Sequence, residues 1–247
     1  MPEPESISEA PQIEPNPDFE FLDAAVLTTP EFVHEDPWRV LRLQSDAIQS
    51  IEMMARSLEG CCRTVAAFGS ARSTETAAEY RIARETCRHL GELGFGIITG
   101  GGPGVMEAAN RGAREAGARS IGLNIRLPQE QRSNPYCDAS YTCHYFFVRK
   151  MMFAKYARGF IIFPGGFGTL DEMFESLTLI QTGKLANFPV VLVGADYWAP
   201  LIDWLESSMA AREFIDDADI ERFVVLDSPH EVAEHVNQRI PQDNESD

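Results

Sequence analysis

The sequence predicts a single α/β domain with a parallel sheet and helices on both faces. Short apolar runs such as residues 65–68 and 190–193 show no alternation, which is typical of strands buried on both sides. Segments with helical periodicity separate these runs, so the sheet is expected to be doubly wound and Rossmann-like. Glycine-containing turns follow three of the predicted strands, where such a sheet binds its ligands.

A leading helix is predicted in front of the sheet, at residues 37–60. Asp36 and Pro37 are a plausible cap and first turn, and apolar residues then recur at helical spacing. This helix is expected to cover the sheet or to pair with a second subunit. Residues 1–36 contain ten of the 38 acidic residues and none of the 21 basic ones, so they predict a largely disordered tail, as do residues 241–247. The domain itself is predicted to span residues 37–240.

Strands and helices are expected to alternate after residue 60. The predicted strands are residues 65–68, 96–99, 120–123, 141–147, 160–163, 190–193 and 223–226. Helical patterns lie near residues 80–90, 105–116, 149–156, 198–209 and 231–239, and another follows the turn after residue 163. A chain of 247 residues with 44% hydrophobic content is long enough to bury one large core of this kind.

Composition excludes several classes of protein. The formal net charge is -17 and no stripe of Lys and Arg is present, so we expect no nucleic-acid partner. No apolar run approaches the roughly 20 residues that span a bilayer, so we expect no membrane association. The five cysteines form no CxxC pair, which indicates a reducing cytoplasm. The five histidines form no metal-binding pair, and we expect no metal site.

The most informative turn is Pro164-Gly-Gly-Phe-Gly-Thr-Leu-Asp-Glu172, which follows a predicted strand and begins a helical pattern. Its glycines let the backbone approach a ligand, and the free N–H groups of a helix start attract a phosphate. Glu172 has no part in phosphate binding. From spacing alone, the favoured interpretation of Glu172 is a capping box with Thr169, in which the carboxylate returns to the start of the helix.

Two further motifs keep alternatives open. The turn at residues 100–104 does not match the dinucleotide fingerprint, because Val105 stands where the last glycine belongs. The next strand ends at Asn124 instead of an acid, so NAD is rejected, whereas a mononucleotide phosphate or ribose site remains open. Arg149 and Lys150 begin a helix, where the helix dipole disfavours cations. They indicate either a bound ligand or a solvated pair with buried stems.

In this order and spacing, the triple-glycine turn, Arg149–Lys150 and the 164–172 motif resemble the Lonely Guy family. Its members are cytokinin riboside 5'-monophosphate phosphoribohydrolases, and relatives are often labelled lysine decarboxylases. The resemblance covers residues 64–227, and residues 127–136 are similar to the longer bacterial branch. Glu107 departs from the family pattern, since many members have Gly there.

The resemblance implies that Arg149 and Glu172 are catalytic. It also implies a set of nucleotide-contacting residues, namely Glu130, Lys150, Gly165, Gly166, Phe167, Gly168, Thr169, Leu170, Asp171 and Thr178. We expect the phosphate on the N–H groups of Gly166, Gly168 and Thr169, with Ser70, Gly101 and Gly102 lining the adjacent turns. The family further implies a homodimer or a multiple of dimers.

The expected reaction is hydrolysis of the N-glycosidic bond of a purine nucleoside 5'-monophosphate, with an adenine-like or cytokinin-type base. A carboxylate near C1' would stabilise the oxocarbenium-like ribose and orient water, and the helix start is expected to keep Glu172 ionised. Arg149 would hold the phosphate or assist the departing base. No cofactor is needed, and amino-acid decarboxylation is disfavoured because no lysine has an evident pyridoxal-phosphate partner. The rival interpretation is a non-catalytic carrier of a nucleotide or of a molybdenum-cofactor-type phosphorylated pterin.

Overall fold

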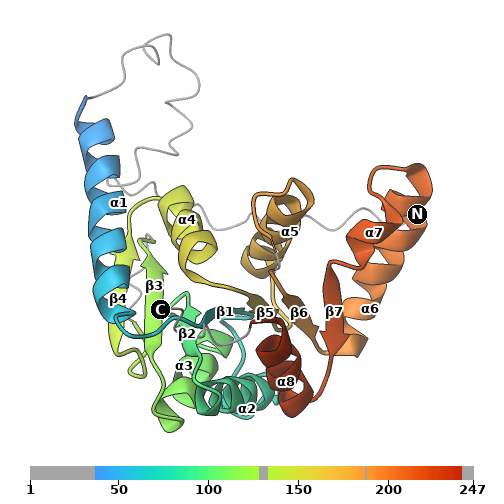
Figure 1. Cartoon of the computed structure of the whole chain (residues 1–247), viewed down its shortest axis with the longest axis horizontal. Helices are drawn as coiled ribbons and strands as arrows, with labels where there is room; N and C mark the ends of the chain where they lie inside the picture. Colours follow the sequence, from blue (N-terminus) through green and yellow to red (C-terminus); the bar gives the residue numbers. More distant parts are fainter. Residues whose placement is uncertain (1–36, 128–132, 187, 241–247) are drawn as a thin grey trace, which may run out of the picture. The chain divides into compact units, whose positions relative to one another are not determined.

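The computed structural model describes residues 37–127, 133–186 and 188–240 (Figure 1). The chain divides into two compact units, Met1–Leu41 and Arg42–Asp247. Of the first unit the structure describes only residues 37–41, at the start of the first helix. The predicted tails, residues 1–36 and 241–247, lie outside the described residues, and the features below belong to the second unit.

Seven parallel strands form one sheet in the order β4-β3-β2-β1-β5-β6-β7. The strands are β1 (Thr64–Phe68), β2 (Gly96–Thr99), β3 (Ser120–Ile125), β4 (Ala139–Cys143), β5 (Phe160–Ile162), β6 (Val190–Val193) and β7 (Phe223–Leu226). Every residue of β1, β2, β3, β5 and β6 is buried, as the uninterrupted apolar runs predicted. The doubly wound α/β fold is therefore confirmed.

Helices cover both faces of the sheet (Figure 1). They are α1 (Pro37–Ser57), α2 (Ala78–Glu92), α3 (Val105–Glu115), α4 (Phe146–Tyr156), α5 (Phe167–Gln181), α6 (Ala195–Trp204), α7 (Asp217–Ile220) and α8 (Pro229–Arg239), with a π-helical turn (Leu205–Met209) and a 3-10 turn (Ala210–Arg212) after α6. One core cluster joins the sheet to α2, α3 and α8. The second cluster joins the opposite face to α4, α5, α6 and Met54 of α1.

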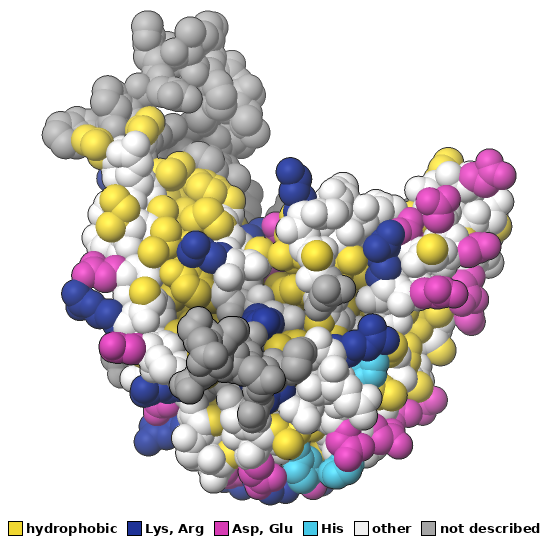
Figure 2. All heavy atoms as spheres, in the orientation of Figure 1, with side chains coloured by type: hydrophobic (Ala, Val, Ile, Leu, Met, Phe, Trp, Pro, Cys, Tyr) yellow, Lys and Arg dark blue, Asp and Glu magenta, His cyan; other side chains and the backbone are white. Residues whose placement is uncertain are grey.

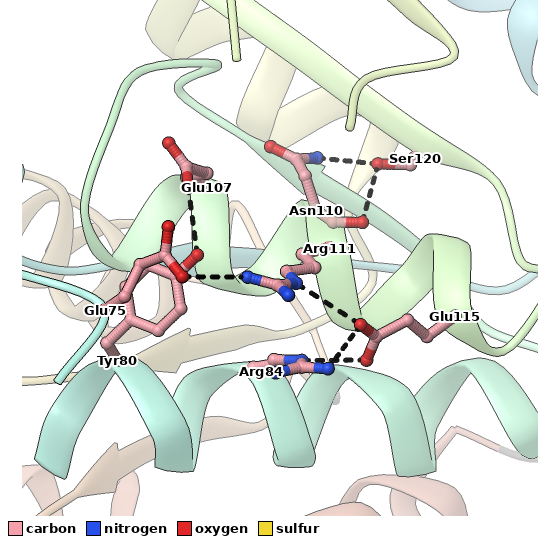
Figure 3. Close-up of polar contacts among 8 residues, drawn as sticks. All are labelled: Glu75, Tyr80, Arg84, Glu107, Asn110, Arg111, Glu115 and Ser120. Atoms are coloured by element: carbon pink, nitrogen blue, oxygen red, sulfur yellow. Dashed lines mark hydrogen bonds and ion pairs between the residues drawn. The ribbon is translucent and has the colours of Figure 1, made fainter. Parts of the chain in front are cut away.

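Helices α2 and α3 pack closely because Gly112 of α3 lies against the backbone of Arg84, where a Cβ would overlap the Arg84 carbonyl oxygen. Polar contacts surround this crossing (Figure 3). Arg84 donates two hydrogen bonds to Glu115, at 2.8 and 2.6 Å. The Tyr80 hydroxyl donates to Glu107 at 3.0 Å. The acid that departs from the family pattern is therefore held by a side chain of α2.

The predicted strand at residues 141–147 is too long by four residues. Strand β4 ends at Cys143, and Phe146 begins α4. The cause is Asp46 of α1, a buried carboxylate that accepts the N–H groups of His144 at 2.9 Å and Tyr145 at 3.2 Å. These N–H groups cannot continue the sheet ladder, and a carboxylate beside the positive end of α4 stabilises the helix start.

None of the described helices combines the length and the apolar composition needed to cross a bilayer. Across the described ranges, no cluster of three His, Cys, Asp or Glu side chains is placed to hold a metal ion. All five cysteines carry free thiols.

Candidate active site

The candidate site lies at the switch point of the sheet, between the neighbouring strands β1 and β5. The chain leaves β1 toward α2 on one face and leaves β5 toward α5 on the other, and doubly wound sheets bind their ligands beyond the carboxyl ends of the strands at such a divergence. Ser70 joins the turns around it. Its N–H donates to the Pro164 carbonyl at 2.9 Å, and its carbonyl accepts the Val105 N–H at 3.0 Å. The turns after β1, β2 and β5 are thus held together at one residue.

The glycine loop after β5 has a closed part and an open part. A Cβ at Gly165 would overlap the Thr169 side chain and the Gly69 carbonyl carbon, so the backbones of the two turns touch there. A Cβ at Gly166 or Gly168 would meet nothing within 4 Å. Neither of these two N–H groups donates a hydrogen bond to another described residue. They are accessible donors at the start of α5, as expected of an anion site.

Two sequence-based expectations about this loop are wrong. Residue Gly166 is the N-cap of α5 and makes no side-chain capping bond, so the capping box of Thr169 and Glu172 does not form. The helix begins at Phe167, three residues earlier than a Thr169 cap requires. In addition, the Thr169 N–H already donates to the Gly166 carbonyl at 3.0 Å. The Thr169 N–H is thus already used in a hydrogen bond at the helix start, whereas the N–H groups of Gly166 and Gly168 are open.

Glu172 lies in the second turn of α5 and is only 8% exposed. Burial raises the pKa of its carboxyl to about 7, although the nearby cations Lys150 and Arg149 lower it. Burial therefore opposes the ionisation that the helix start is expected to favour. Since Gly168 and Glu172 are four residues apart, they lie on the same side of α5. The carboxyl and the open N–H group thus face the same region.

Arg149 of α4 forms another wall of the crevice. Its guanidinium packs against Gly100 at the end of β2, where a Cβ would collide with Nη2. Its Nε is buried and has no hydrogen-bond partner among the described residues. Burial lowers the pKa of Arg149 and the charge of Glu172 raises it. A half-buried cation whose Nε is fully buried and unpaired, next to a buried carboxylate, is a costly arrangement that a polar ligand would stabilise.

Lys150, the next residue of α4, reaches α5 and contacts carboxylates there. Its Nζ lies 2.8 Å from Asp171 Oδ2 and 2.6 Å from Glu175 Oε2, but 3.8 Å from Glu172 Oε1. Burial lowers the pKa of Lys150, and the hydrogen bonds to Asp171 and Glu175 raise it by more, so the net shift is upward. The ammonium is therefore a stable cation, held mainly by the two residues that flank Glu172 on the helix.

The turn after β2 is rigid and largely buried. Gly101 has φ +71° and lies against the Asn124 side chain, so no other residue fits there. Its N–H donates to Thr99 Oγ1 at 2.9 Å, and Asn134 donates to the carbonyls of Gly101 and Gly102 at 2.8 and 3.0 Å. These bonds fix the turn against which Arg149 packs. They also leave the Gly101 N–H unavailable to a ligand.

The other predicted contact residues lie at different depths. Phe167 is 92% exposed at the first position of α5, and Leu170 is partly buried in the core on its face. Thr178 is exposed two turns beyond Glu172, and its hydroxyl donates to the Phe174 carbonyl at 2.7 Å. Glu130 lies outside the described residues. The structure thus brings Arg149, Lys150, Asp171 and Glu172 together, and it places Thr178 farther along α5.

Four residues near the site were missed by sequence reasoning. They are Asp46, Gly100, Glu175 and Tyr197. Glu175 follows Glu172 by three residues, so helical spacing could have signalled it. The Tyr197 hydroxyl donates to the Gly165 carbonyl at 2.5 Å from the first turn of α6, and nothing in the sequence pairs these positions.

Glycine turns, a buried carboxylate and a half-buried arginine at the switch point define a Rossmann-type ligand-binding domain. The model of a family described as "Possible lysine decarboxylase" matches residues 106–236, more than half of the chain. The chain belongs to this family, and the resemblance to the Lonely Guy proteins is confirmed by curated relatives of that name.

The chain is similar to a probable cytokinin riboside 5'-monophosphate phosphoribohydrolase, LOG4, of Oryza sativa subsp. japonica. They are 28% identical over 186 residues, which are 74% of this chain and 80% of the rice protein. A Mycobacterium tuberculosis protein named cytokinin riboside 5'-monophosphate phosphoribohydrolase is 28% identical over 170 residues, 67% of this chain and 88% of its own length. An Escherichia coli pyrimidine/purine nucleotide 5'-monophosphate nucleosidase is 29% identical over 177 residues, but these are only 38% of that longer protein.

Solved structures share the fold. The structural-genomics target TM1055 superimposes with a TM-score of 0.56 at 25% identity, over 71% of this chain and 99% of that chain. The molybdenum cofactor binding protein of Rippkaea orientalis gives a TM-score of 0.53 at 20% identity, over 72% and 96%. At that identity the second likeness concerns the fold alone.

Proposed function

We propose that this protein is a phosphoribohydrolase that cleaves the N-glycosidic bond of a purine nucleoside 5'-monophosphate. The products are the free base and ribose 5-phosphate. The observation that carries the proposal is that one helix, α5, begins with open N–H groups at Gly166 and Gly168 and holds the buried Glu172 carboxyl in its second turn. Relatives named for this reaction support it.

Each part of the nucleotide has a partner in this proposal. The phosphate binds the open N–H groups of the glycine loop, where the helix dipole favours an anion. The ribose then lies beside Glu172, and Asp171 and Lys150 contact its polar groups. Arg149 packs against the turn after β2 instead of the glycine loop. This position supports assistance to the departing base more than a role in phosphate binding.

Glu172 is proposed to act as the general base and as the charge that stabilises the ribose. As the bond between C1' and the base breaks, its electron pair moves to the base nitrogen and positive charge develops on the ribose. Water attacks C1' and gives one proton to Glu172, and the base nitrogen takes up one proton, so that one water is consumed for each free base released. A carboxyl whose pKa is about 7 suits this step, because about half of it is ionised near neutral pH and it is still basic enough to take a proton.

The test is a product assay with AMP and an N6-substituted AMP, followed by a panel of other nucleoside monophosphates. We expect free base and ribose 5-phosphate in equal amounts. Glu172→Gln should still bind AMP and lose about 100-fold or more in turnover. Glu206→Gln, an exposed carboxylate on the π-helical turn, is the matched control and should retain the parent rate. Stable binding of AMP without release of base would support the carrier interpretation instead.

Decarboxylation is not proposed despite the description of the family. A pyridoxal-phosphate Schiff base requires a lysine that can lose its proton and reach the aldehyde. Lys150 is the lysine of the crevice, and its ammonium is held by Asp171 and Glu175 with a raised pKa. After incubation with pyridoxal phosphate, the absence of an internal-aldimine absorption band at about 410–430 nm would agree with this assignment.

We further propose that the protein is a homodimer in the cytoplasm. Exposed apolar side chains gather over α1 and α4 in Figure 2, namely Ile48, Ile51, Phe146, Phe147 and Met151. An apolar patch of this kind is typical of a subunit interface. It shares α4 with Arg149, so assembly would stabilise the site. Light scattering should give twice the chain mass of 27.5 kDa, and Phe147→Asp should give the monomer. The free thiols agree with a reducing compartment.

A further inference from the structure

We propose that Glu175 is a positioning residue for the proposed hydrolysis. It keeps the Lys150 ammonium from forming a hydrogen bond with Glu172, the general base. The inference rests on the proposed function and deepens it, because it assigns a role to a carboxylate that does not itself touch the nucleotide. It follows from how three acids of one helix share one cation.

The geometry of the cluster is unequal. Lys150 Nζ makes short contacts with Glu175 Oε2 at 2.6 Å and Asp171 Oδ2 at 2.8 Å. Glu172 Oε1 is 3.8 Å away, beyond hydrogen-bond distance. Asp171 and Glu175 are four residues apart, so their side chains project from the same side of α5. The ammonium lies between these two carboxylates. The Glu172 carboxylate accepts no hydrogen bond from another described residue.

This arrangement preserves the basicity of Glu172. A hydrogen-bonded ion pair stabilises the ionised carboxylate and makes it a weaker base. A cation at 3.8 Å attracts the carboxylate without occupying its lone pairs, so these remain free for water. Lys150 and Asp171 are already expected to contact the substrate. Glu175 is the remaining partner, and its contact with Lys150 keeps the ammonium at the far side of the cluster.

The charged groups that face Glu172 are few. Lys150 and Arg149 of α4 lower its pKa, and Glu175 and Asp171 of α5 raise it. Cys143 of β4 is next to Arg149, and burial keeps its thiol protonated near neutral pH. Removal of the Glu175 charge therefore acts in one direction only. It removes a repulsion and also frees an ammonium donor for Glu172.

The test is Glu175→Gln, which retains the size of the side chain. We expect the acidic limb of the kcat profile to move to lower pH by about one unit, the effect of a close charge. At pH 8 we expect kcat to fall about tenfold with KM nearly unchanged, because the base is weaker while the binding groups remain. Glu206→Gln should change neither quantity.

A second measurement separates positioning from a simple charge effect. In a Lys150→Met background, Glu175→Gln can act only by removing repulsion, so the shift of the limb should be clearly smaller. Equal shifts in both backgrounds, or no shift in the Lys150 protein, would overturn the proposal. Glu175→Asp retains the charge and should restore most of the parent profile.

The titration can be read without turnover. Carbon-13 NMR of labelled glutamate carboxyls, with the Glu172 signal assigned by its loss in Glu172→Gln, should show the same downward shift in Glu175→Gln. If the nucleotide assay fails and this shift is present, the electrostatic role stands and the proposed reaction does not. If the assay succeeds and the Glu172 titration is unmoved, the role of Glu175 is refuted.

Discussion

The guanidinium of Arg149 lies directly against Gly100, so a side chain of α4 rests on the backbone at the end of β2. A Cβ at Gly100 would collide with Nη2 of Arg149 and with Sδ of Met106. Met106 is flexible and can move aside. The Nε of Arg149 is fully buried, so its guanidinium has less freedom to do so.

Gly100→Ala should therefore displace the guanidinium and lower kcat/KM by about 10- to 100-fold, the usual cost of a misplaced catalytic group. Steady-state kinetics on AMP measure the loss. Gly96→Ala, at the other end of β2, is the matched control because its nearest neighbour is the Cys61 Sγ at 3.0 Å. If the two variants had the same kcat/KM, the contact between Gly100 and Arg149 would have no catalytic importance.

The pH dependence of turnover should follow the titration of Glu172. Burial raises its pKa to about 7, and the base must be ionised to accept a proton. Activity should thus be highest above pH 7 and should fall tenfold for each pH unit below it. The substrate phosphate titrates near pH ~6 and contributes a separate step. A kcat profile that stays flat between about pH 5 and pH 8 would contradict this assignment.

Because of the same burial, the ionised form of Glu172 lowers the free energy of unfolding. A carboxyl whose pKa is higher in the folded than in the unfolded chain stabilises the fold while it is protonated. This stabilisation is present below the unfolded pKa of about 4.5 and disappears as the pH rises through about 7. Glu172→Gln is neutral at every pH, so it should be more stable than the parent at pH ~8 by about 1–3 kcal/mol.

Thermal unfolding at two pH values checks this expectation. The gain from Glu172→Gln should be large at pH ~8 and close to zero at pH ~4. Glu206→Gln should show no comparable difference, since that side chain is exposed. A variant less stable than the parent at pH ~8 would mean that the ionised carboxylate contributes favourable contacts. Gained stability together with lost turnover is the pattern expected of an active-site carboxylate.

Much of the fold and part of the site could be predicted from the sequence. The buried strands are uninterrupted apolar runs, and parallel strands bring their carboxyl-end turns to one edge. This is why Ser70, Gly104 and Pro164 meet in the structure. The charged residues at that edge could also be predicted, because Arg149 lies in the first turn of a helix, where the dipole disfavours a cation.

The remaining features depend on distances between segments far apart in the chain. Asp46 caps a helix that starts 100 residues later, and no local pattern signals such a contact. The ionisation of Glu172 could not be predicted either, since spacing reveals the helix dipole but not how much water surrounds the carboxyl. The partners of Lys150 could not be predicted for the same reason, because its distances to the three neighbouring carboxylates depend on side-chain conformation.

Tyr197 is expected to hold the glycine loop in its binding conformation. Its hydroxyl donates to the Gly165 carbonyl at 2.5 Å, and this peptide carries the open N–H of Gly166. Tyr197→Phe removes the bond without removing the ring, so the peptide gains freedom that the bound phosphate must then restrict. We expect KM to rise about three- to tenfold, which corresponds to one hydrogen bond of ~1 kcal/mol, with kcat little changed.

Tyr156→Phe is the matched control for this change, because the Tyr156 hydroxyl also donates to a backbone carbonyl, that of Ile51, at 3.2 Å and away from the glycine loop. Inorganic phosphate as a competitive inhibitor gives a second measure. Its inhibition constant should rise in Tyr197→Phe by the same factor as KM, because both report the anion site. A rise in KM without a change in phosphate inhibition would show that Tyr197 acts on another part of the nucleotide.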